Sequence, residues 1–281
     1  MSEFDAQNYW EKRLRDHFSL EGVGYLRLGK QYNEWMYKVR RVVFDRVAEK
    51  WAIGQRAPSL REAPAQPRAA GSELRVIDIG SGTGFYVERW LARGARVTGV
   101  DITDVAVSEL RGRFPQATFL RADIGAALGT ELAGQRGSFD AASAFDVLFH
   151  IVDDERYARA LANIGALLKP GGWFLWSDNF IHRPTMRVVH QASRSLAEST
   201  AAVQAAGFEI VDRVPMFVLM NYPIDTTSRL AHWAWTAMVS PALLSDALGG
   251  LLGRMLFGIE CRLVASRRES PTTELMICRK R

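Results

Sequence analysis

The chain has 281 residues, of which 48% are hydrophobic and 24% charged, with a formal net charge of +5 and a pI near 9.4. This length supports one large domain with a sizeable core. Its two cysteines exclude a disulfide framework and a thiolate metal cluster, which fits a reducing compartment. The arginines are scattered, without a dense basic run and interleaved aromatic residues, so we expect no nucleic-acid partner.

The first residues, MSEFDAQNYWEKRLRD, are charged and contain no apolar stretch, so they are not a secretory signal and we expect a cytoplasmic protein. The chain has no run of about eighteen uncharged apolar residues, so we expect no membrane span. The closest segment, PALLSDALGGLLGRMLFGIE, carries Asp246, Arg254 and Glu260. Contact with a lipid surface stays open.

The N-terminal part is predicted to be helical over residues 8–51, where aromatic residues are frequent. We interpret residues 1–53 as a helical lid. Residues 54–73 contain mostly Pro, Ala, Gly and Arg without apolar periodicity, which predicts a flexible linker.

From Leu74 onward, apolar strands alternate with helices. Such alternation predicts a parallel sheet that is covered by helices on both faces. The predicted strands are residues 74–80, 95–103, 117–124, 139–145 and 173–180. The predicted helices are residues 84–94, 104–114 and 153–168, the last of which is stopped by Lys-Pro-Gly-Gly.

The C-terminal part continues with a helix over residues 194–207 and a sixth strand over residues 208–219. Residues 223–267 are predicted to be helical, because apolar residues recur there at helical spacing. A last strand, residues 272–280, closes the chain. We therefore divide the chain into the lid, the linker, a core (74–215), a helical cap (216–270) and a final strand (271–281).

Three glycines at alternate positions, Gly80, Gly82 and Gly84, follow the first strand and open the first helix. Glycine permits positive φ and leaves a helix N-terminus open to a ligand. A dinucleotide-binding loop would have its third glycine where Phe85 stands. Asp78 places a carboxylate just before the loop, which is unfavourable beside a pyrophosphate and favourable beside an ammonium or sulfonium group. The loop therefore favours a sulfonium nucleoside over a dinucleotide.

The segment DIGSGTG resembles motif I of the class I S-adenosylmethionine-dependent methyltransferases, in particular those that act on small molecules. The resemblance covers about Leu74 to Asp212 and the closing strand, because the later strands keep the family's order. It implies an α/β fold with a Rossmann-like seven-stranded, mostly parallel sheet, helices on both faces, and the helical cap inserted before the last strand. It also implies S-adenosyl-L-methionine as the cofactor and S-adenosyl-L-homocysteine as its product.

The resemblance also assigns binding residues. Asp101, at the end of the second strand, is placed on the ribose hydroxyls, and Asp123 and Ile124 flank the adenine. The alternative for both aspartates is that they cap the next helix. The cofactor-binding residues that we predict are Asp78, Gly80, Ser81, Gly82, Gly84, Asp101, Ile102, Asp123, Ile124, Phe145 and Tyr32.

Candidates for catalysis follow the fourth and fifth strands, since ligands of an open α/β sheet bind at the carboxyl ends of its strands. Methyl transfer to a hydroxyl needs alignment and removal of a proton, and histidine suits the second task. His150 and His182 are the candidate bases, and Asp178 can orient an acceptor hydroxyl. The structural alternatives are a helix cap or pocket wall for His150 and a strand end for Asp178.

The helical segments at either end of the chain are candidates for acceptor binding. Tyr25, Tyr32, Tyr37 and Arg40 can touch the methionine end of the cofactor or the acceptor, or pack as an aromatic stripe on the sheet edge. Residues 229–260 are more apolar than a surface helix requires. They form either a roof over a large, partly apolar acceptor, or a helical pair that packs in the core or joins two copies in a homodimer.

The leading function is methylation, most simply on oxygen, of a small or medium-sized metabolite such as a natural product, sugar or lipid-like acceptor. The alternatives are a cofactor-binding protein that does not methylate, regulatory or cyclase-like, and an RNA methyltransferase that only the pI favours. The sequence lacks the Lys–Asp–His arrangement of the cation-dependent catechol enzymes, so we predict no metal. It also lacks N-P-P-Y and D-P-P-Y motifs, which counts against DNA adenine and glutamine amide methylation.

Overall fold

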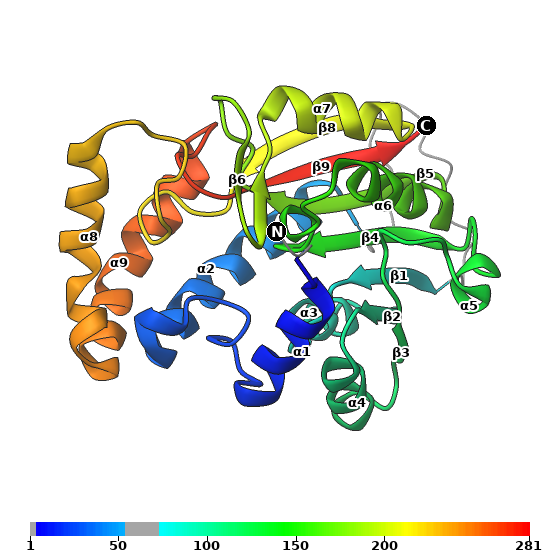
Figure 1. Cartoon of the computed structure of the whole chain (residues 1–281), viewed down its shortest axis with the longest axis horizontal. Coiled ribbons are helices and arrows are strands. Elements are labelled where there is room, and N and C mark those ends of the chain that lie inside the picture. The colour runs from blue at the N-terminus through cyan, green and yellow to red at the C-terminus, as the bar shows by residue number, and fades with distance from the viewer. Residues whose placement is uncertain (1–3, 54–72) are drawn as a thin grey trace.

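The computed structural model describes residues 4–53 and 73–281. A seven-stranded sheet in the order β3-β2-β1-β4-β5-β9-β8 forms its centre (Figure 1). β9 is antiparallel to both of its neighbours, and the other neighbouring pairs are parallel. The predicted seven-stranded, mostly parallel sheet is confirmed. Its strands are β1 (Leu74–Ile79), β2 (Ala95–Asp101), β3 (Thr118–Arg121), β4 (Phe139–Phe145), β5 (Leu168–Asp178), β8 (Phe208–Pro215) and β9 (Glu274–Lys280).

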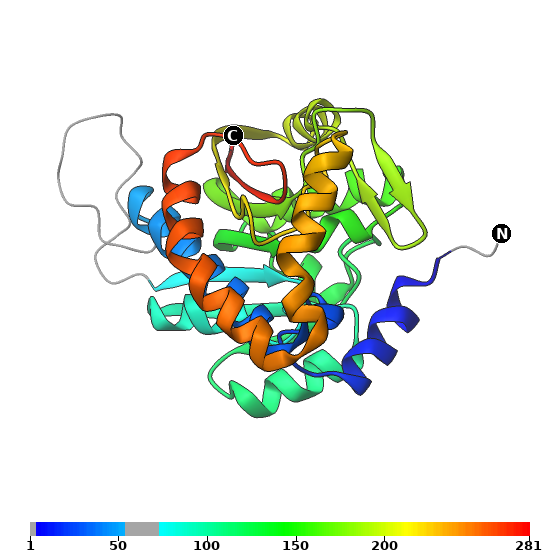
Figure 2. The same ribbon diagram turned by 90° about the vertical axis from the view of Figure 1, so that its left-hand side faces the viewer.

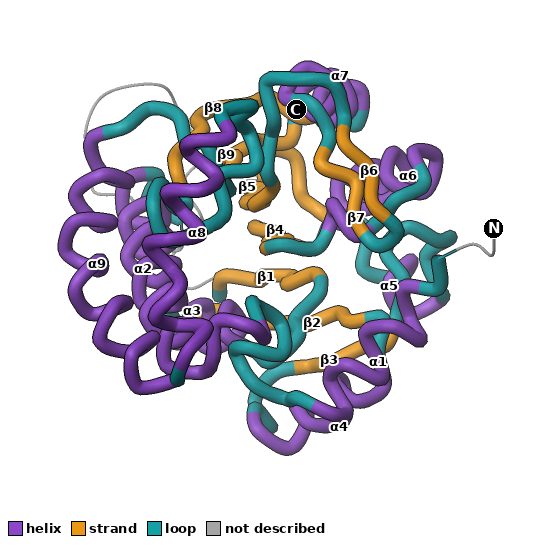
Figure 3. The backbone as a smooth tube through the Cα atoms, turned by 60° about the vertical axis from the view of Figure 1, so that its left-hand side comes forward, coloured by secondary structure: helices purple, strands orange, loops and turns teal. Residues whose placement is uncertain are grey.

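Helices cover both faces of this sheet (Figure 3). Neighbouring strand residues alternate between the faces, so Val76 packs in the core under one helical layer and Ile77 in the core under the other. The first layer contains α2 (Gly29–Lys50), α3 (Phe85–Ala92) and α4 (Asp104–Arg113). The second contains α5 (Thr130–Ala133), α6 (Asp154–Leu167) and α7 (Leu196–Ala205).

The N-terminal region is two helices instead of the predicted continuous one. α1 (Ala6–Asp16) ends before a tight turn, and α2 follows a 3₁₀ turn at Leu26–Leu28. Arg13 fixes the turn by donating to the carbonyl oxygens of Gly22 at 2.6 Å and Gly24 at 2.7 Å. The two glycines interrupt the helical pattern and free α1 to lie away from α2. The predicted linker, apart from Glu73, lies outside the described residues.

The cap consists of α8 (Arg229–Leu244) and α9 (Asp246–Ser266), which lie side by side across α2 (Figure 2). Ser245 breaks the helix between them and caps α9 by accepting a hydrogen bond from the amide of Leu248. A glycine allows the close approach of α9 to α2, because a Cβ at Gly253 would lie 2.7 Å from Cδ1 of Trp35. Within the described residues, no helix is long and apolar enough to cross a membrane.

A buried carboxylate attaches α9 to the segment that follows β8. Glu260 of α9 has no exposed surface, and it accepts hydrogen bonds from the backbone amides of Val218, Leu219 and Met220 at 2.7, 2.9 and 3.3 Å. Burial raises the pKa of Glu260. Glu260 was noted in the sequence only as a charge that opposes a membrane span. The three amides explain why a carboxylate is accommodated in this buried position.

Two local features differ from the prediction. A small hairpin, β6 (Met186–Val188) and β7 (Gln191–Ser193), follows β5, where only a loop was expected. Strands of three residues are too short for a pattern in the sequence. The segment Lys169–Gly172, expected to separate helix from strand, lies inside β5, with a register shift against β4. The division of the chain into lid, core, cap and final strand stays a prediction.

Candidate functional site

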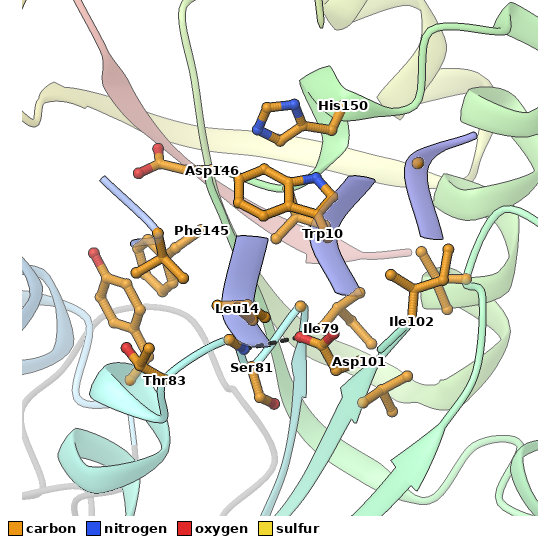
Figure 4. A pocket seen from close by; sticks show the side chains of 18 of the residues that line it. Trp10, Leu14, Ile79, Ser81, Thr83, Asp101, Ile102, Phe145, Asp146 and His150 are labelled. Atoms are coloured by element: carbon orange, nitrogen blue, oxygen red, sulfur yellow. Dashed lines mark hydrogen bonds between the residues drawn. The ribbon is translucent and has the colours of Figure 1, made fainter. Parts of the chain in front are cut away.

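A first cavity lies at the carboxyl ends of β1, β2 and β4, and α1 covers it with Trp10 and Leu14 (Figure 4). The structure brings together most of the predicted cofactor-binding residues around this cavity. Those that line it are Gly80, Ser81, Gly82, Asp101, Ile102, Asp123, Ile124 and Phe145, together with the base candidate His150.

The glycine loop shapes the floor of this cavity. Gly80, Gly82 and Gly84 have φ values of +67°, +52° and +82°, which side chains rarely adopt. Gly84 lies just outside the cavity, and a Cβ there would be 2.6 Å from both Leu110 and Phe114. The first two glycines therefore expose backbone to a ligand, whereas the third allows α3 to pack closely on α4.

Asp101 is held in place by the loop itself. Its Oδ1 accepts hydrogen bonds from the amide and hydroxyl of Thr103 at 3.0 and 2.7 Å, and its Oδ2 accepts one from the amide of Gly82 at 2.9 Å. Burial raises the pKa of this carboxyl. A carboxylate has about four lone-pair positions, so one on Oδ2 stays available to a hydroxyl donor in the cavity.

The third strand provides an apolar slot beside a second carboxylate. Ile102 and Ile124 line the cavity, and Asp123 lies between the strand end and α6. Asp123 Oδ1 accepts from the amide of Gly125 at 2.8 Å, and its Oδ2 pairs with Arg156. Each oxygen retains a free lone pair, so the slot combines apolar walls with an acceptor for an amino group.

Two residues predicted to bind the cofactor, Asp78 and Tyr32, do not line this cavity. The carboxylate of Asp78 does not line the cavity, because it lies beneath the loop and its Oδ1 accepts from the hydroxyl of Ser143 at 2.5 Å. Burial raises its pKa to about 7. Tyr32 is fully buried in the core between α2 and the cap, and its hydroxyl donates to the carbonyl of Met220 at 3.0 Å. The sequence places both residues near the site but gives no information on the direction of their side chains.

A second cavity of about 700 Å³ adjoins the first. Its volume is in the range of pockets that hold small organic ligands. The two cavities share one wall, made by Trp10, Val23, Tyr37, Asp146 and His150. The second cavity is rich in aromatic rings from the lid, from the turn after β4, and from α8 and the segment before it. These rings are Tyr9, Trp10, Tyr25, Tyr37, Phe149, Tyr222 and Trp235.

An ion pair lies at the shared wall. Arg40 of α2 is buried, and its Nη2 lies 2.5 Å from Oδ2 of Asp146. Asp146 has a φ of +58°, and it exchanges hydrogen bonds with Ser177, whose hydroxyl bonds both its amide and its Oδ1. The hydroxyl of Tyr86 also interacts with the guanidinium of Arg40, whose Nε and Nη1 are buried and make no further hydrogen bond among the described residues. Arg40 lines the second cavity and not the first, and a guanidinium in this position favours an anionic group of a ligand nearby.

The two base candidates lie in different places. His150 lines both cavities, and its Nδ1 is 2.8 Å from the carbonyl oxygen of His190. That contact requires a proton on Nδ1 and leaves a lone pair on Nε2. Burial lowers the pKa of His150 to about 4, so the ring is neutral near pH 7. His182 lines neither cavity and instead pairs with Asp225, with 2.6 Å between Nδ1 and Oδ2, so its role as a base stays a prediction without geometric support.

Asp178 also lines neither cavity. It is buried, its Oδ1 accepts from the amide of Asn179 at 2.7 Å, and its Oδ2 accepts from the indole of Trp176 at 3.3 Å. Burial raises its pKa to about 7. The neighbouring Asn179 is the residue of this strand end that reaches the second cavity. No group of three or more His, Cys, Asp or Glu side chains that could hold a metal ion occurs in the described part of the chain.

We expect His182 to give a small pH-dependent stabilisation. The carboxylate of Asp225 raises the pKa of His182 above its usual 6.5, so the ion pair is fully present below that value and is lost as pH rises through the folded-state pKa. Because the side chain is 43% exposed, the effect on the melting temperature should not exceed about 2 °C. Thermal unfolding between pH 5 and 9 measures it, with His182→Asn expected to flatten this part of the curve. An unchanged curve in the variant would contradict the assignment.

The fold and the first cavity define a Rossmann-like protein with a nucleoside-type site at the carboxyl edge of its sheet. Residues 76–172 match the family described as a methyltransferase domain. The chain is 34% identical over 109 residues to the ubiquinone biosynthesis O-methyltransferase of Bordetella pertussis, covering 38% of this chain and 43% of that protein. It is 33% identical over 106 residues to the enzyme of the same name from Chromobacterium violaceum, covering 37% of this chain and 43% of that protein. The match spans about two fifths of the length of these relatives.

A solved structure resembles most of the chain. The phosphoethanolamine N-methyltransferase 2 of Haemonchus contortus, in complex with phosphomonomethylethanolamine and S-adenosylhomocysteine, aligns with a TM-score of 0.53 at 16% identity. The alignment covers 96% of this chain and 60% of that one, and at this identity it shows the fold. The match of residues 76–172 to a methyltransferase domain agrees with the resemblance that the glycine loop indicated.

Proposed function

We propose that this protein transfers a methyl group from S-adenosylmethionine to an oxygen atom of a small or medium-sized, partly apolar acceptor. One observation carries the proposal: a cavity built on the glycine loop and a second, aromatic-lined cavity meet at a single wall. A donor in the first cavity and an acceptor in the second would meet where the two cavities adjoin, as in-line displacement requires.

The residues of the first cavity fit the donor. The free lone pair of Asp101 would accept from a ribose hydroxyl, and Asp123 with Ile102 and Ile124 would hold the adenine. The guanidinium of Arg40, which lines the second cavity beside the shared wall, would attract the carboxylate of the methionine moiety. These assignments use the hydrogen-bonding capacity that the protein itself leaves unused.

The second cavity supplies the acceptor side of the reaction. When bound, S-adenosylmethionine offers an electrophilic methyl group on a sulfonium and leaves as neutral S-adenosylhomocysteine. His150 would accept the proton that the acceptor hydroxyl loses, through its Nε2, while the carbonyl of His190 holds the Nδ1 proton. The aromatic lining suits a flat, partly apolar acceptor. The name of the curated relatives, ubiquinone biosynthesis O-methyltransferase, supports oxygen as the receiving atom.

The test is transfer of a labelled methyl group from S-adenosylmethionine to a panel of phenols, hydroxyquinones, sugars, amines and bulk RNA. We expect label on phenolic or quinone hydroxyls, and Asp101→Ala should weaken donor binding in calorimetry by about tenfold to a hundredfold, since it removes an acceptor for charge-assisted hydrogen bonds. Donor binding without transfer to any acceptor would favour the non-methylating alternative. Label on RNA, with binding that weakens steeply as salt is added, would favour the RNA enzyme.

A further inference from the structure

The outer surface of the cap carries two rows of exposed apolar side chains. On α8 and on α9 these residues recur at intervals that keep them on one face of each helix. Their exposed fractions lie between 51% and 78%, which is high for residues of this kind. The set, called the cap face below, consists of Leu230, Trp233, Leu244, Leu251, Met255 and Ile259.

The cap face lies opposite the surface that packs on the core. The other side of α9 bears Gly253 against Trp35 of α2 and the buried Glu260. Figure 2 shows both cap helices in front of the rest of the molecule, on one side of it. The apolar rows are therefore not needed for folding of the described chain, and none of the described residues covers them.

The charge around the cap face is positive. Residues 229–268 contain two carboxylates, and both are engaged: Glu260 is buried against three amides, and Asp246 accepts from the amide of Gln31 at 2.8 Å. The arginines of the same segment are exposed and make no ion pair within the described chain. They are Arg229, Arg254, Arg262, Arg267 and Arg268.

The second cavity reaches the surface beside the cap face. Leu243 lines this cavity and is also 51% exposed, and its neighbour in sequence is Leu244 of the cap face. Leu26 and Tyr25 of the lid also line the cavity and are more than one third exposed. An apolar acceptor can thus enter the cavity from the side on which the apolar rows lie.

We propose that the cap face binds peripherally to the surface of an anionic lipid bilayer. α8 and α9 would lie in the plane of the interface, with the leucines, Trp233, Met255 and Ile259 among the acyl chains and the arginines on lipid phosphates. A second copy of the chain fits less well, because a two-fold contact would bring the same five arginines towards each other, with Asp246 as the one exposed carboxylate of residues 229–268.

Vesicle sedimentation with the full chain tests this proposal. The wild type should sediment with vesicles of equal parts phosphatidylglycerol and phosphatidylcholine, and much less with phosphatidylcholine alone. Leu251→Glu/Met255→Glu should lower the bound fraction by about tenfold or more, and Arg254→Gln/Arg262→Gln should lower it on the anionic vesicles. The matched control, Val188→Glu/Val189→Glu, changes two exposed valines on the β6–β7 turn and should bind like the wild type. Circular dichroism and melting temperature establish that each variant is folded.

Three results would overturn the proposal: no sedimentation of the wild type with anionic vesicles, undiminished binding of the Leu251→Glu/Met255→Glu variant, or an equal loss in the valine control. If the wild type does not bind vesicles but forms a dimer that Leu251→Glu/Met255→Glu dissociates, the cap face joins two copies instead. Vesicle binding needs neither donor nor acceptor. Its failure would therefore leave the proposed methyl transfer untouched, and a failed transfer assay would not affect this result.

Discussion

His150→Ala should lower the single-turnover rate of methyl transfer by about a hundredfold to ten-thousandfold, the range of a lost general base. His150 is the histidine that lines both cavities, and the carbonyl of His190 fixes the proton on its Nδ1. Its Nε2 is thus ready to accept a proton without a change of tautomer. Quenched-flow measurement with labelled donor and the acceptor identified by the transfer assay gives the rate, with donor affinity determined separately.

The pH profile and a second histidine make this test specific. Burial lowers the pKa of His150 to about 4, so the rate should stay level from pH 8 down to about pH 5 and fall only below that. His182→Ala, outside both cavities, should leave the rate within about twofold of the wild type. A rate that survives in His150→Ala would mean that the acceptor needs no histidine base, as with a carbon acceptor that is already an enolate.

Local sequence signals predicted well which residues meet around the first cavity. The glycines and Asp101 lie within one strand–loop–helix unit and at the end of the next strand, so the topology alone brings them together. The directions of the side chains were harder to predict from the sequence. Asp78 and Asp178 both stand at strand ends, yet each carboxylate is buried and bonded to Ser143 or Asn179 instead of facing a cavity. Alternation along a strand fixes which face of the sheet a residue occupies, but it does not determine whether the side chain points into a cavity or bonds to a neighbouring residue.

The acceptor side could not be derived from the sequence, because its walls come from segments far apart in the chain. Arg40 and Asp146 are separated by more than a hundred residues, and their pairing depends on how α2 lies across β4. The lid turn at Gly22 and Gly24, which places Trp10 over the first cavity, depends on tertiary hydrogen bonds from Arg13. Such contacts leave no periodic pattern, and a single sequence gives no other signal for them.

Among the residues of the site, we expect substitutions in the Arg40–Asp146 pair to lower the stability of the protein most. Asp146→Asn should lower the free energy of unfolding by about 3 kcal/mol, because the buried guanidinium of Arg40 then lacks a counter-charge. Asparagine tolerates positive φ and can keep a hydrogen bond with Ser177, so the substitution removes the charge of Asp146 and changes little else. Arg40→Met should lower the free energy of unfolding by about 1 kcal/mol less than Asp146→Asn does, since the Asp146 side chain is 22% exposed and can be hydrated.

A double-mutant cycle in urea, with m-values compared, separates the pair from its surroundings. The variant with both substitutions should be more stable than Asp146→Asn alone, because it removes the unpaired guanidinium along with the carboxylate. Strictly additive losses would show that the two residues act independently. Arg40→Met should also weaken S-adenosylmethionine binding by about tenfold, because it removes the guanidinium that lines the second cavity beside the shared wall, whereas Asp146→Asn retains it. Equal donor affinity in the two variants would place the methionine carboxylate away from Arg40 and leave the guanidinium with a structural role at the shared wall.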